Sequence, residues 1–261
     1  MTNRRTVDLN SDLGEGFGAW QMGDDQAMLD IVSSANLACG FHAGDPIVMA
    51  DRAATAKAKC VDIGAHPSFF DLFGFGRWQI RGDSPADIEK MVAYQIGALQ
   101  ATAALSGHRV THVKPHGSLG NMAAVEADLA LAIGRAIKGV DASLIYVVMP
   151  GSQMERAAET LGLTMAREVF ADRAYDDDGN LVSRKIAGSV IHDPAEAARR
   201  TVEMVRSSSL TSTSGKRIPV KVDTICVHGD NPAAVALARA VRAALEAAGF
   251  AIAPMRTALA A

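Results

Sequence analysis

Residues 38–46 read Ala38-Cys39-Gly40-Phe41-His42-Ala43-Gly44-Asp45-Pro46. In this stretch a short apolar run ends at a histidine, small residues follow, and an aspartate and a proline come next. Aspartate caps the free amides at a helix start, and proline favours the first helical position. The stretch therefore predicts the carboxyl end of a β-strand that turns directly into a helix.

The same order of residue types recurs along the chain. It is repeated at Ile225-Cys226-Val227-His228-Gly229-Asp230-Asn231-Pro232, and looser versions are Ile63-Gly64-Ala65-His66-Pro67 and His112-Val113-Lys114-Pro115-His116-Gly117. Four histidines are thus predicted to stand where four strands end.

Seven short apolar segments alternate with helical patterns, and polar residues follow each of them. They are residues 7–12, 37–39, 61–65, 110–114, 144–149, 163–170 and 222–227. Repeated strand–helix units imply a parallel sheet, either closed as a barrel or open and doubly wound. We favour the barrel because an open sheet concentrates its polar site at one switch point, and because the sequence contains neither a dinucleotide fingerprint nor a Walker A motif.

The predicted fold is therefore α/β, a (β/α)7-type barrel that resembles the glycoside hydrolase and deacetylase barrels. We expect one barrel domain over residues 1–261, with a mobile insertion at 207–217, which is rich in serine and threonine. A second loop, residues 68–82, holds Phe69, Phe70, Phe73 and Phe75. These rings either form a lid or line a ligand site, or else they pack as a satellite core under the loop.

Composition gives no support for several classes of partner. Of 261 residues, 49% are hydrophobic and 21% are charged, and the net charge is −3. This balance suits a globular core and gives no reason to expect nucleic acid or a membrane surface as a partner. The sequence shows no signal peptide and no apolar stretch that would span a bilayer, and its three cysteines fit reduced thiols. We expect a cytoplasmic protein.

In a (β/α) barrel the strand ends share one rim, where active sites lie. The residues predicted to meet there are Asp12, His42, His66, Lys114, His116, Glu168, Asp172 and His228. Histidines at equivalent positions, with carboxylates beside them, favour a functional site over isolated structural residues. His112 is expected to be a hydrogen-bonded core residue, and His108 and His192 are expected to be surface residues.

Two chemistries suit this set. In the first, Asp12, His42 and His66 bind a divalent metal that polarises a carbonyl or activates water. In the second, which needs no metal, Lys114 supplies fixed positive charge while His116 and Asp12 transfer protons. Arginines are candidates for a bidentate clamp on a substrate carboxylate: Arg77, Arg173 and Arg184. A thiolate nucleophile, Cys39 or Cys226, is the least favoured hypothesis because small buried cysteines are common in parallel strands.

The motifs resemble those of a known family, LamB/YcsF. They are Asp8-Leu9-Asn10-x-Asp12-Leu13-Gly14-Glu15-Gly16-Phe17-Gly18, the stretch from Ser33 to Pro46, Gly64-Ala65-His66-Pro67, Gly74-Phe75-Gly76-Arg77, His112 to Gly117, Phe170-Ala171-Asp172-Arg173-x-Tyr175, and Cys226 to Pro232. The match runs in the expected order from about residue 7 to residue 250.

The resemblance implies a barrel akin to that of polysaccharide deacetylases and a component of a prokaryotic ATP-dependent 5-oxoprolinase. The implied reaction opens 5-oxoproline (pyroglutamate) to L-glutamate, with ATP as co-substrate and two partner subunits. On this interpretation Asp12, Lys114 and His116 are catalytic. The residues expected to contact the substrate are His42, His66, Arg77, Asp172, Arg173 and His228.

Three positions depart from the family pattern: Ser11 replaces a usual cysteine, Ser68 a usual glycine, and Gly120 a usual tyrosine. The last change removes a ring and a hydroxyl near the expected site and bears on substrate identity. Two other functions stay open, a metal-dependent amidase or carbohydrate deacetylase on the same barrel, and a non-catalytic binding or scaffold subunit of the complex.

Overall fold

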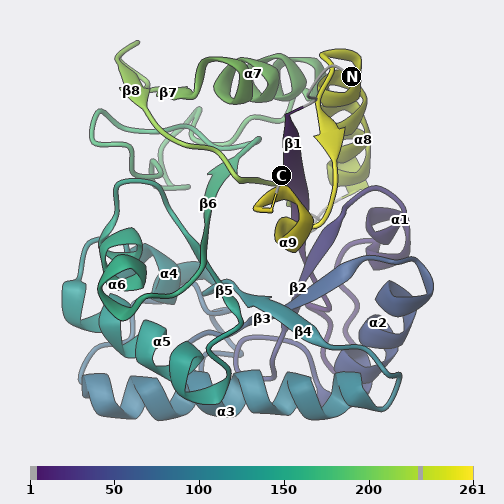
Figure 1. Ribbon diagram of the computed structural model, residues 1–261, viewed down its shortest axis with the longest axis vertical. Helices are drawn as coiled ribbons and strands as arrows, with labels where there is room; N and C mark the ends of the chain where they lie inside the picture. Colours follow the sequence, from purple (N-terminus) through teal and green to yellow (C-terminus); the bar gives the residue numbers. More distant parts are fainter. Residues whose placement is uncertain (1–4, 229–231, 261) are drawn as a thin grey trace.

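The alternating strands and helices close into a barrel in the computed structural model, which describes residues 5–228 and 232–260 (Figure 1). Seven parallel strands of the described chain pair in the order β1-β2-β3-β4-β5-β6-β9, and β9 pairs with β1 to close the ring. Their bounds are β1 Thr6–Leu13, β2 Ser34–Ala38, β3 Asp62–His66, β4 Val110–Val113, β5 Ile145–Val148, β6 Met165–Phe170 and β9 Thr224–Cys226. The predicted (β/α)7-type barrel is confirmed.

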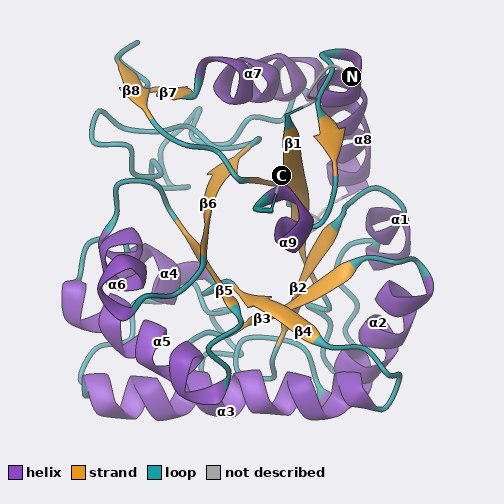
Figure 2. Cartoon of the chain, in the orientation of Figure 1, coloured by secondary structure: helices purple, strands orange, loops and turns teal. Residues whose placement is uncertain are grey.

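Helices surround the ring of strands (Figure 2). They are α1 Asp25–Leu29, α2 Pro46–Ala58, α3 Pro85–Ala104, α4 Gly117–Ala123, α5 Ala127–Val140, α6 Gln153–Leu161, α7 Pro194–Ser207 and α8 Pro232–Ala247. The local sequence explains where they begin. Asp45 accepts hydrogen bonds from the amides of Ile47 and Val48 at the start of α2, and Pro46 occupies the first turn, as the opening stretch predicts. The matching turn at residues 229–231 lies outside the described residues.

The two ends of the barrel differ in character. At the amino-terminal end of the strands, β10 (Ala251–Ile252) pairs in parallel with β1, and α9 (Met255–Ala258) lies beside β1 (Figure 1). Met255 is 1% exposed and packs with Ile145, Val147 and Ala166 of β5 and β6. This apolar plug fills the bottom of the barrel at β5 and β6.

Alternate side chains of β1 form a polar ladder inside the barrel. Asp8 accepts hydrogen bonds from Ser34 and Thr224 at 2.6 and 2.5 Å, and Asn10 donates to Glu168 at 3.0 Å. At the carboxyl-terminal end of β1, Oδ1 of Asp12 accepts a hydrogen bond from the side-chain amide of Asn36 at 2.9 Å. Because buried polar groups need partners, this ladder fixes the side-chain positions that lead up to the rim.

The segment predicted to be a mobile insertion, 207–217, overlaps a two-stranded antiparallel ribbon, β7 (Ser209–Thr211) with β8 (Arg217–Pro219). Its mobility stays a prediction. Among the helices of the described ranges, none combines the length and the apolar character needed to cross a membrane.

Candidate active site

The predicted rim residues do meet at the carboxyl-terminal end of the strands. The central side chain is Lys114, which follows β4 and is 4% exposed. Its Nζ lies 2.8 Å from Oδ1 of Asp12 and 2.9 Å from Oε1 of Glu168, and it is 3.1 Å from Sγ of Cys226. Burial alone would lower the pKa of Lys114, but the neighbouring Asp12 and Glu168 carboxylates raise it well above its ordinary value. Lys114 is thus a fixed buried cation.

A network behind these groups orients Asp12. The ring of His112 is fully buried and donates from Nε2 to Oδ1 of Asn36 at 2.9 Å. Asn36 in turn donates to Oδ1 of Asp12, the oxygen that also receives Lys114. A Cβ atom on Gly64 would lie 2.1 Å from the His112 ring, so glycine is needed at this position of β3. The prediction of a hydrogen-bonded core histidine at His112 is confirmed.

One side of the rim holds three histidines and a carboxylate. Possible ligand atoms of Glu15, His42, His66 and His116 all lie within 4.8 Å of one another, and all four residues are buried. The rings of His42 and His116 stack, with centroids 3.7 Å apart. Burial and the neighbouring histidines hold the pKa values of His42 and His116 well below the ordinary value, while burial raises the pKa of Glu15. Both rings are therefore neutral at pH 7.

The opposite side of the rim carries Asp172, Arg173 and His228. His228 donates from Nδ1 to Asp172 at 2.7 Å, and its Nε2 accepts from Arg184 at 3.0 Å. Burial opposes ionisation of Asp172, but His228 and Arg184 outweigh it and lower its pKa. Arg173 is buried and donates to the carbonyl of Val182 at 2.6 Å, while its Nε has no hydrogen bond to any described residue. Arg173 and Arg184 thus bring two cationic side chains to this side of the rim.

The loop over residues 68–82 frames the site. The amide of Ser118 donates to the carbonyl of Gly76 at 2.9 Å, and a Cβ on Gly76, whose φ is +63°, would lie 2.7 Å from the ring of His116. Phe75 packs edge-on against His42, and Arg77 lies over the Phe75 ring at 5.0 Å. The two explanations of the aromatic loop therefore each hold in part: Phe75 lines the site, Phe69 is buried in the core, and Phe70 and Phe73 are exposed.

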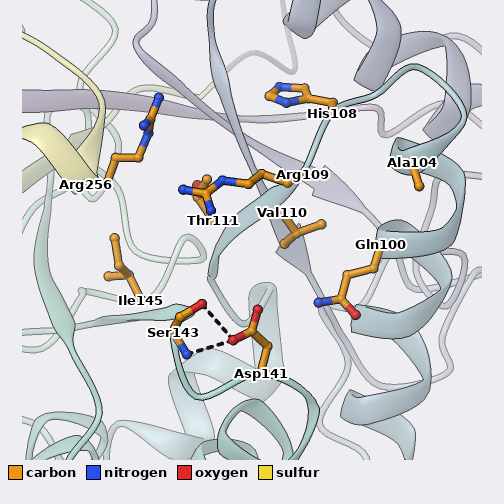
Figure 3. Close-up of a pocket in the computed structure, with 10 residues that line it drawn as sticks. All are labelled: Gln100, Ala104, His108, Arg109, Val110, Thr111, Asp141, Ser143, Ile145 and Arg256. Atoms are coloured by element: carbon orange, nitrogen blue, oxygen red, sulfur yellow. Dashed lines mark hydrogen bonds between the residues drawn. The ribbon is translucent and has the colours of Figure 1, made fainter.

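Two cavities have the size of a small-molecule site. One, of about 400 Å³, opens beside Glu15 and His42 and is otherwise walled by Phe17, Ala19, Trp20, Gln21, Met22, Ala43, Leu72 and Phe75. The other, of about 380 Å³, lies at the starts of β4 and β5, and Figure 3 shows its lining. There Asp141 is already bonded by the amide and hydroxyl of Ser143. Since (β/α) barrels place their chemistry at the carboxyl ends of the strands, we assign the site to the first cavity.

The predicted metal trio is not gathered as one set. The structure groups His42 and His66 with Glu15 and His116, and it groups Asp12 with Cys226 and His228.

Glu15 is the residue that sequence reasoning missed. In the sequence, Glu15 is recognisable only as a carboxylate between two glycines just after the first strand. Its place in the site depends on the loop after β1 folding back toward the loop after β2. That return is fixed by a hydrogen bond from the amide of Gly44 to the carbonyl of Gly16 at 2.8 Å.

Comparison with known proteins decides the family. The sequence profile of the LamB/YcsF family matches residues 7–260. The chain belongs to the LamB/YcsF family. This confirms the resemblance drawn from the motifs.

Two relatives agree with this assignment, and a more distant structure shares the fold alone. A 5-oxoprolinase subunit from Rhodopseudomonas palustris (strain BisB18) is 58% identical over 249 residues, covering 95% of this chain and 98% of that protein. The crystal structure of a lactam utilization protein from Thermus thermophilus has 45% identity and a TM-score of 0.90, covering 95% of this chain and 99% of that one. A peptidoglycan N-acetylglucosamine deacetylase domain from Eubacterium rectale ATCC 33656, at 11% identity, a TM-score of 0.52 and coverage of 99% and 91%, shares the fold alone.

Proposed function

We propose that this chain is the ring-opening component of a 5-oxoprolinase, which converts 5-oxoproline (pyroglutamate) to L-glutamate. The observation that carries the proposal is the match of almost the whole chain, at 58% identity, to a protein named as a 5-oxoprolinase subunit. The cavity of about 400 Å³ beside the rim suits a substrate as small as a five-membered lactam.

We further propose that ring opening is coupled to ATP hydrolysis and needs two partner subunits. An unstrained lactam is a poor electrophile, and transfer of a phosphoryl group from ATP to its amide oxygen turns that oxygen into a leaving group. Water then adds to the carbon, the ring nitrogen takes a proton and leaves as the carbon–nitrogen bond breaks, and an acyl phosphate is formed. A second water hydrolyses this acyl phosphate, which releases L-glutamate and inorganic phosphate. The sequence carries no Walker A motif, so the partners supply some or all of the ATP site. We place this complex in the cytoplasm.

The residues take the following roles in this proposal. Lys114 stabilises negative charge that develops on the oxygen, since it is a cation already held in place by Asp12. Asp12 and His116 move protons between water and the ring nitrogen. Recognition of the substrate falls to His42, His66, Arg77, Asp172, Arg173 and His228. Arg173 suits the substrate carboxylate because its buried Nε has no hydrogen-bond acceptor among the described residues.

The test is formation of glutamate and ADP from 5-oxoproline and ATP, with the chain reconstituted with its two partner proteins. Asp12→Asn and His116→Gln should each abolish turnover while the complex still assembles. Glutamine at 116 keeps a donor for the carbonyl of Phe75, so the loop stays attached. His192→Asn, at an exposed histidine, is the matched control and should keep the wild-type rate.

Other outcomes would favour the other functions. Amide cleavage by this chain without ATP would favour a metal-dependent amidase or deacetylase. Wild-type turnover in both rim variants would favour a non-catalytic binding or scaffold role in the complex and would end the assignment of Asp12 and His116.

A further inference from the structure

Five side chains bring hydrogen-bond acceptors into one row beside the cavity. Oδ2 of Asp12 lies 3.3 Å from Nε2 of His66, which lies 3.0 Å from Nδ1 of His116. Nδ1 of His116 lies 3.4 Å from Oε1 of Glu15, and that oxygen lies 3.4 Å from Nε2 of His42. The row crosses the rim between the catalytic carboxylate and the cavity wall.

Backbone carbonyls fix the tautomers of the two central rings. Nδ1 of His66 lies 2.6 Å from the carbonyl oxygen of Lys114, and Nε2 of His116 lies 2.8 Å from that of Phe75. A carbonyl oxygen only accepts, so these nitrogens carry the hydrogens, and in neutral rings the nitrogens that face each other carry lone pairs. Carboxylate oxygens also only accept. Lone pairs that face one another repel and form no hydrogen bond, so this row of acceptors is stable only when a cation lies among them.

A proton does not satisfy this row. A proton added to one ring would let that ring donate a hydrogen bond to one or two neighbouring acceptors. Oε1 of Glu15 and both ring nitrogens of His42, however, have no hydrogen bond to any residue the structure describes. Glu15 is 8% exposed and His42 is 1% exposed, so water is largely excluded from them. Leaving several such buried groups unpaired costs about 1–3 kcal/mol each. One ion that contacts Oε1 of Glu15 and Nε2 of His42 removes this cost for those two atoms.

The spacing of the row fits a tetrahedral metal. Ligand atoms about 2.0–2.1 Å from a zinc ion stand about 3.3 Å apart along the edges of the tetrahedron. Three of the six ligand–ligand separations lie near that edge length, at 3.0, 3.4 and 3.4 Å, and all four ligand atoms lie within 4.8 Å of one another. Ligating histidines also commonly donate their other ring nitrogen to a backbone carbonyl, as His66 and His116 do here.

We propose that this chain binds one divalent transition-metal ion of the zinc class. Its ligands are Oε1 of Glu15, Nε2 of His42, Nε2 of His66 and Nδ1 of His116, and Asp12 borders the ion. Three imidazoles and one carboxylate select zinc and similar metals over magnesium or calcium, which prefer oxygen ligands. Metal binding stands on this geometry alone. Its use, to polarise the lactam carbonyl, rests on the proposed function; with the ion bound, both nitrogens of His116 are engaged and proton transfer falls to Asp12.

The test is metal binding by the whole chain, without ATP, substrate or partners. After chelation and dialysis, calorimetric titration with Zn²⁺ and elemental analysis should give one equivalent per chain. Co²⁺ should bind at the same place, with the visible absorption of a four-coordinate site and no thiolate charge-transfer band. Because this assay does not need turnover, its failure would leave the ring-opening proposal standing, and failure of that proposal would leave the metal site standing.

Matched variants locate the ion. His66→Asn and His116→Gln each keep a donor for the carbonyl that holds the ring and lose only the ligand nitrogen, so affinity should fall at least 100-fold; Glu15→Gln should also weaken binding. His192→Asn should bind like the wild type. Melting temperatures of the metal-free forms show whether each variant folds. Absence of binding at millimolar Zn²⁺, or a Co²⁺–thiolate band that Cys226→Ser removes, would overturn the proposal.

Discussion

The Nζ atom of Lys114 lies 2.8 Å from Oδ1 of Asp12, and the two side chains are only 6% and 10% exposed. Lys114 also bonds the buried Glu168 at 2.9 Å. Lys114→Met would leave two carboxylates in the barrel without their cation. Removing one partner of a buried ion pair costs about 3–5 kcal/mol, and we expect the free energy of unfolding to fall by that amount in urea titrations.

A surface lysine provides the control for Lys114. Lys221 pairs with Asp223 at 3.0 Å, but its side chain is 62% exposed. Lys221→Met should change the free energy of unfolding by no more than about 1 kcal/mol, because water screens an exposed pair. Equal effects at the two positions would contradict the role of Lys114 as a buried cation. Adding Glu168→Gln to Lys114→Met should restore part of the loss.

Asp8, at the bottom of the polar ladder, predicts a pH dependence of stability. Burial raises its pKa from 3.8 to about 6, although hydrogen bonds from Ser34, Thr224 and Ser33 oppose the shift. The folded state therefore binds the proton more tightly than the unfolded state. This stabilisation is complete below pH 3.8 and is lost as the pH rises through 6.

The measurement compares wild type with Asp8→Asn, which cannot ionise at this position. Between pH 5 and pH 8 the wild type should lose about 1 kcal/mol relative to the variant, out of about 3 kcal/mol over the whole titration. Urea unfolding at several pH values gives this difference, and changes due to other groups are common to both proteins. A difference that does not vary with pH would show that Asp8 titrates alike in both states.

The barrel could be predicted because its signals are local. Each strand is an apolar run that ends in polar residues, and the helix after β2 begins with Asp45 and Pro46. The plug at the bottom could not be predicted in this way. Helix α9 has one turn, and its position follows from Met255 fitting among Ile145, Val147 and Ala166, which are far away in the sequence.

The site was predictable in its members but not in their grouping. A residue at a strand end must reach the rim, so His42, His66 and His116 were identifiable from strand boundaries. Which atoms meet depends on ring orientation, and contacts from the loops set it. The carbonyl of Phe75, in a loop between β3 and α3, holds the His116 ring. Such a contact has no signature in the sequence.

Gly120 should resist substitution although it lies in a helix. Gly→Ala inside a helix usually stabilises by about 0.5–1 kcal/mol. A Cβ on Gly120 in α4, however, would lie 2.8 Å from the carbonyl oxygen of Pro115, so the turn that carries His116 would have to shift. We expect Gly120→Ala to lower the free energy of unfolding by about 1–3 kcal/mol.

Gly97 in α3 is the matched control, because a Cβ there meets no heavy atom of the described chain within 4 Å. Gly97→Ala should raise the free energy of unfolding by about 0.5–1 kcal/mol. Chemical unfolding of both variants under one condition gives the comparison. Stabilisation by both substitutions would mean that α4 moves easily and would contradict the close approach to Pro115 as a constraint on position 120.

The reactivity of the three cysteine thiols tests the hypothesis that Cys39 or Cys226 is a thiolate nucleophile. Cys60 is exposed, whereas Cys39 and Cys226 are buried. Burial raises the pKa of Cys39 to about 12 and that of Cys226 well above its ordinary value. Only thiolates react readily with disulfide reagents, so the native protein at pH 8 should release one equivalent of chromophore from Ellman's reagent.

Cys60→Ser should abolish this native reaction, and unfolding of the wild type should expose all three thiols. Rapid native labelling of Cys226 would contradict the expectation, because the ammonium of Lys114 at 3.1 Å would then be stabilising a thiolate instead of serving Asp12 and Glu168. Cys226→Ser in the reconstituted assay separates the two roles of that cation. A thiolate nucleophile predicts loss of turnover, whereas a lysine that stabilises oxygen charge predicts that turnover persists, since a hydroxyl still accepts a hydrogen bond from the same ammonium.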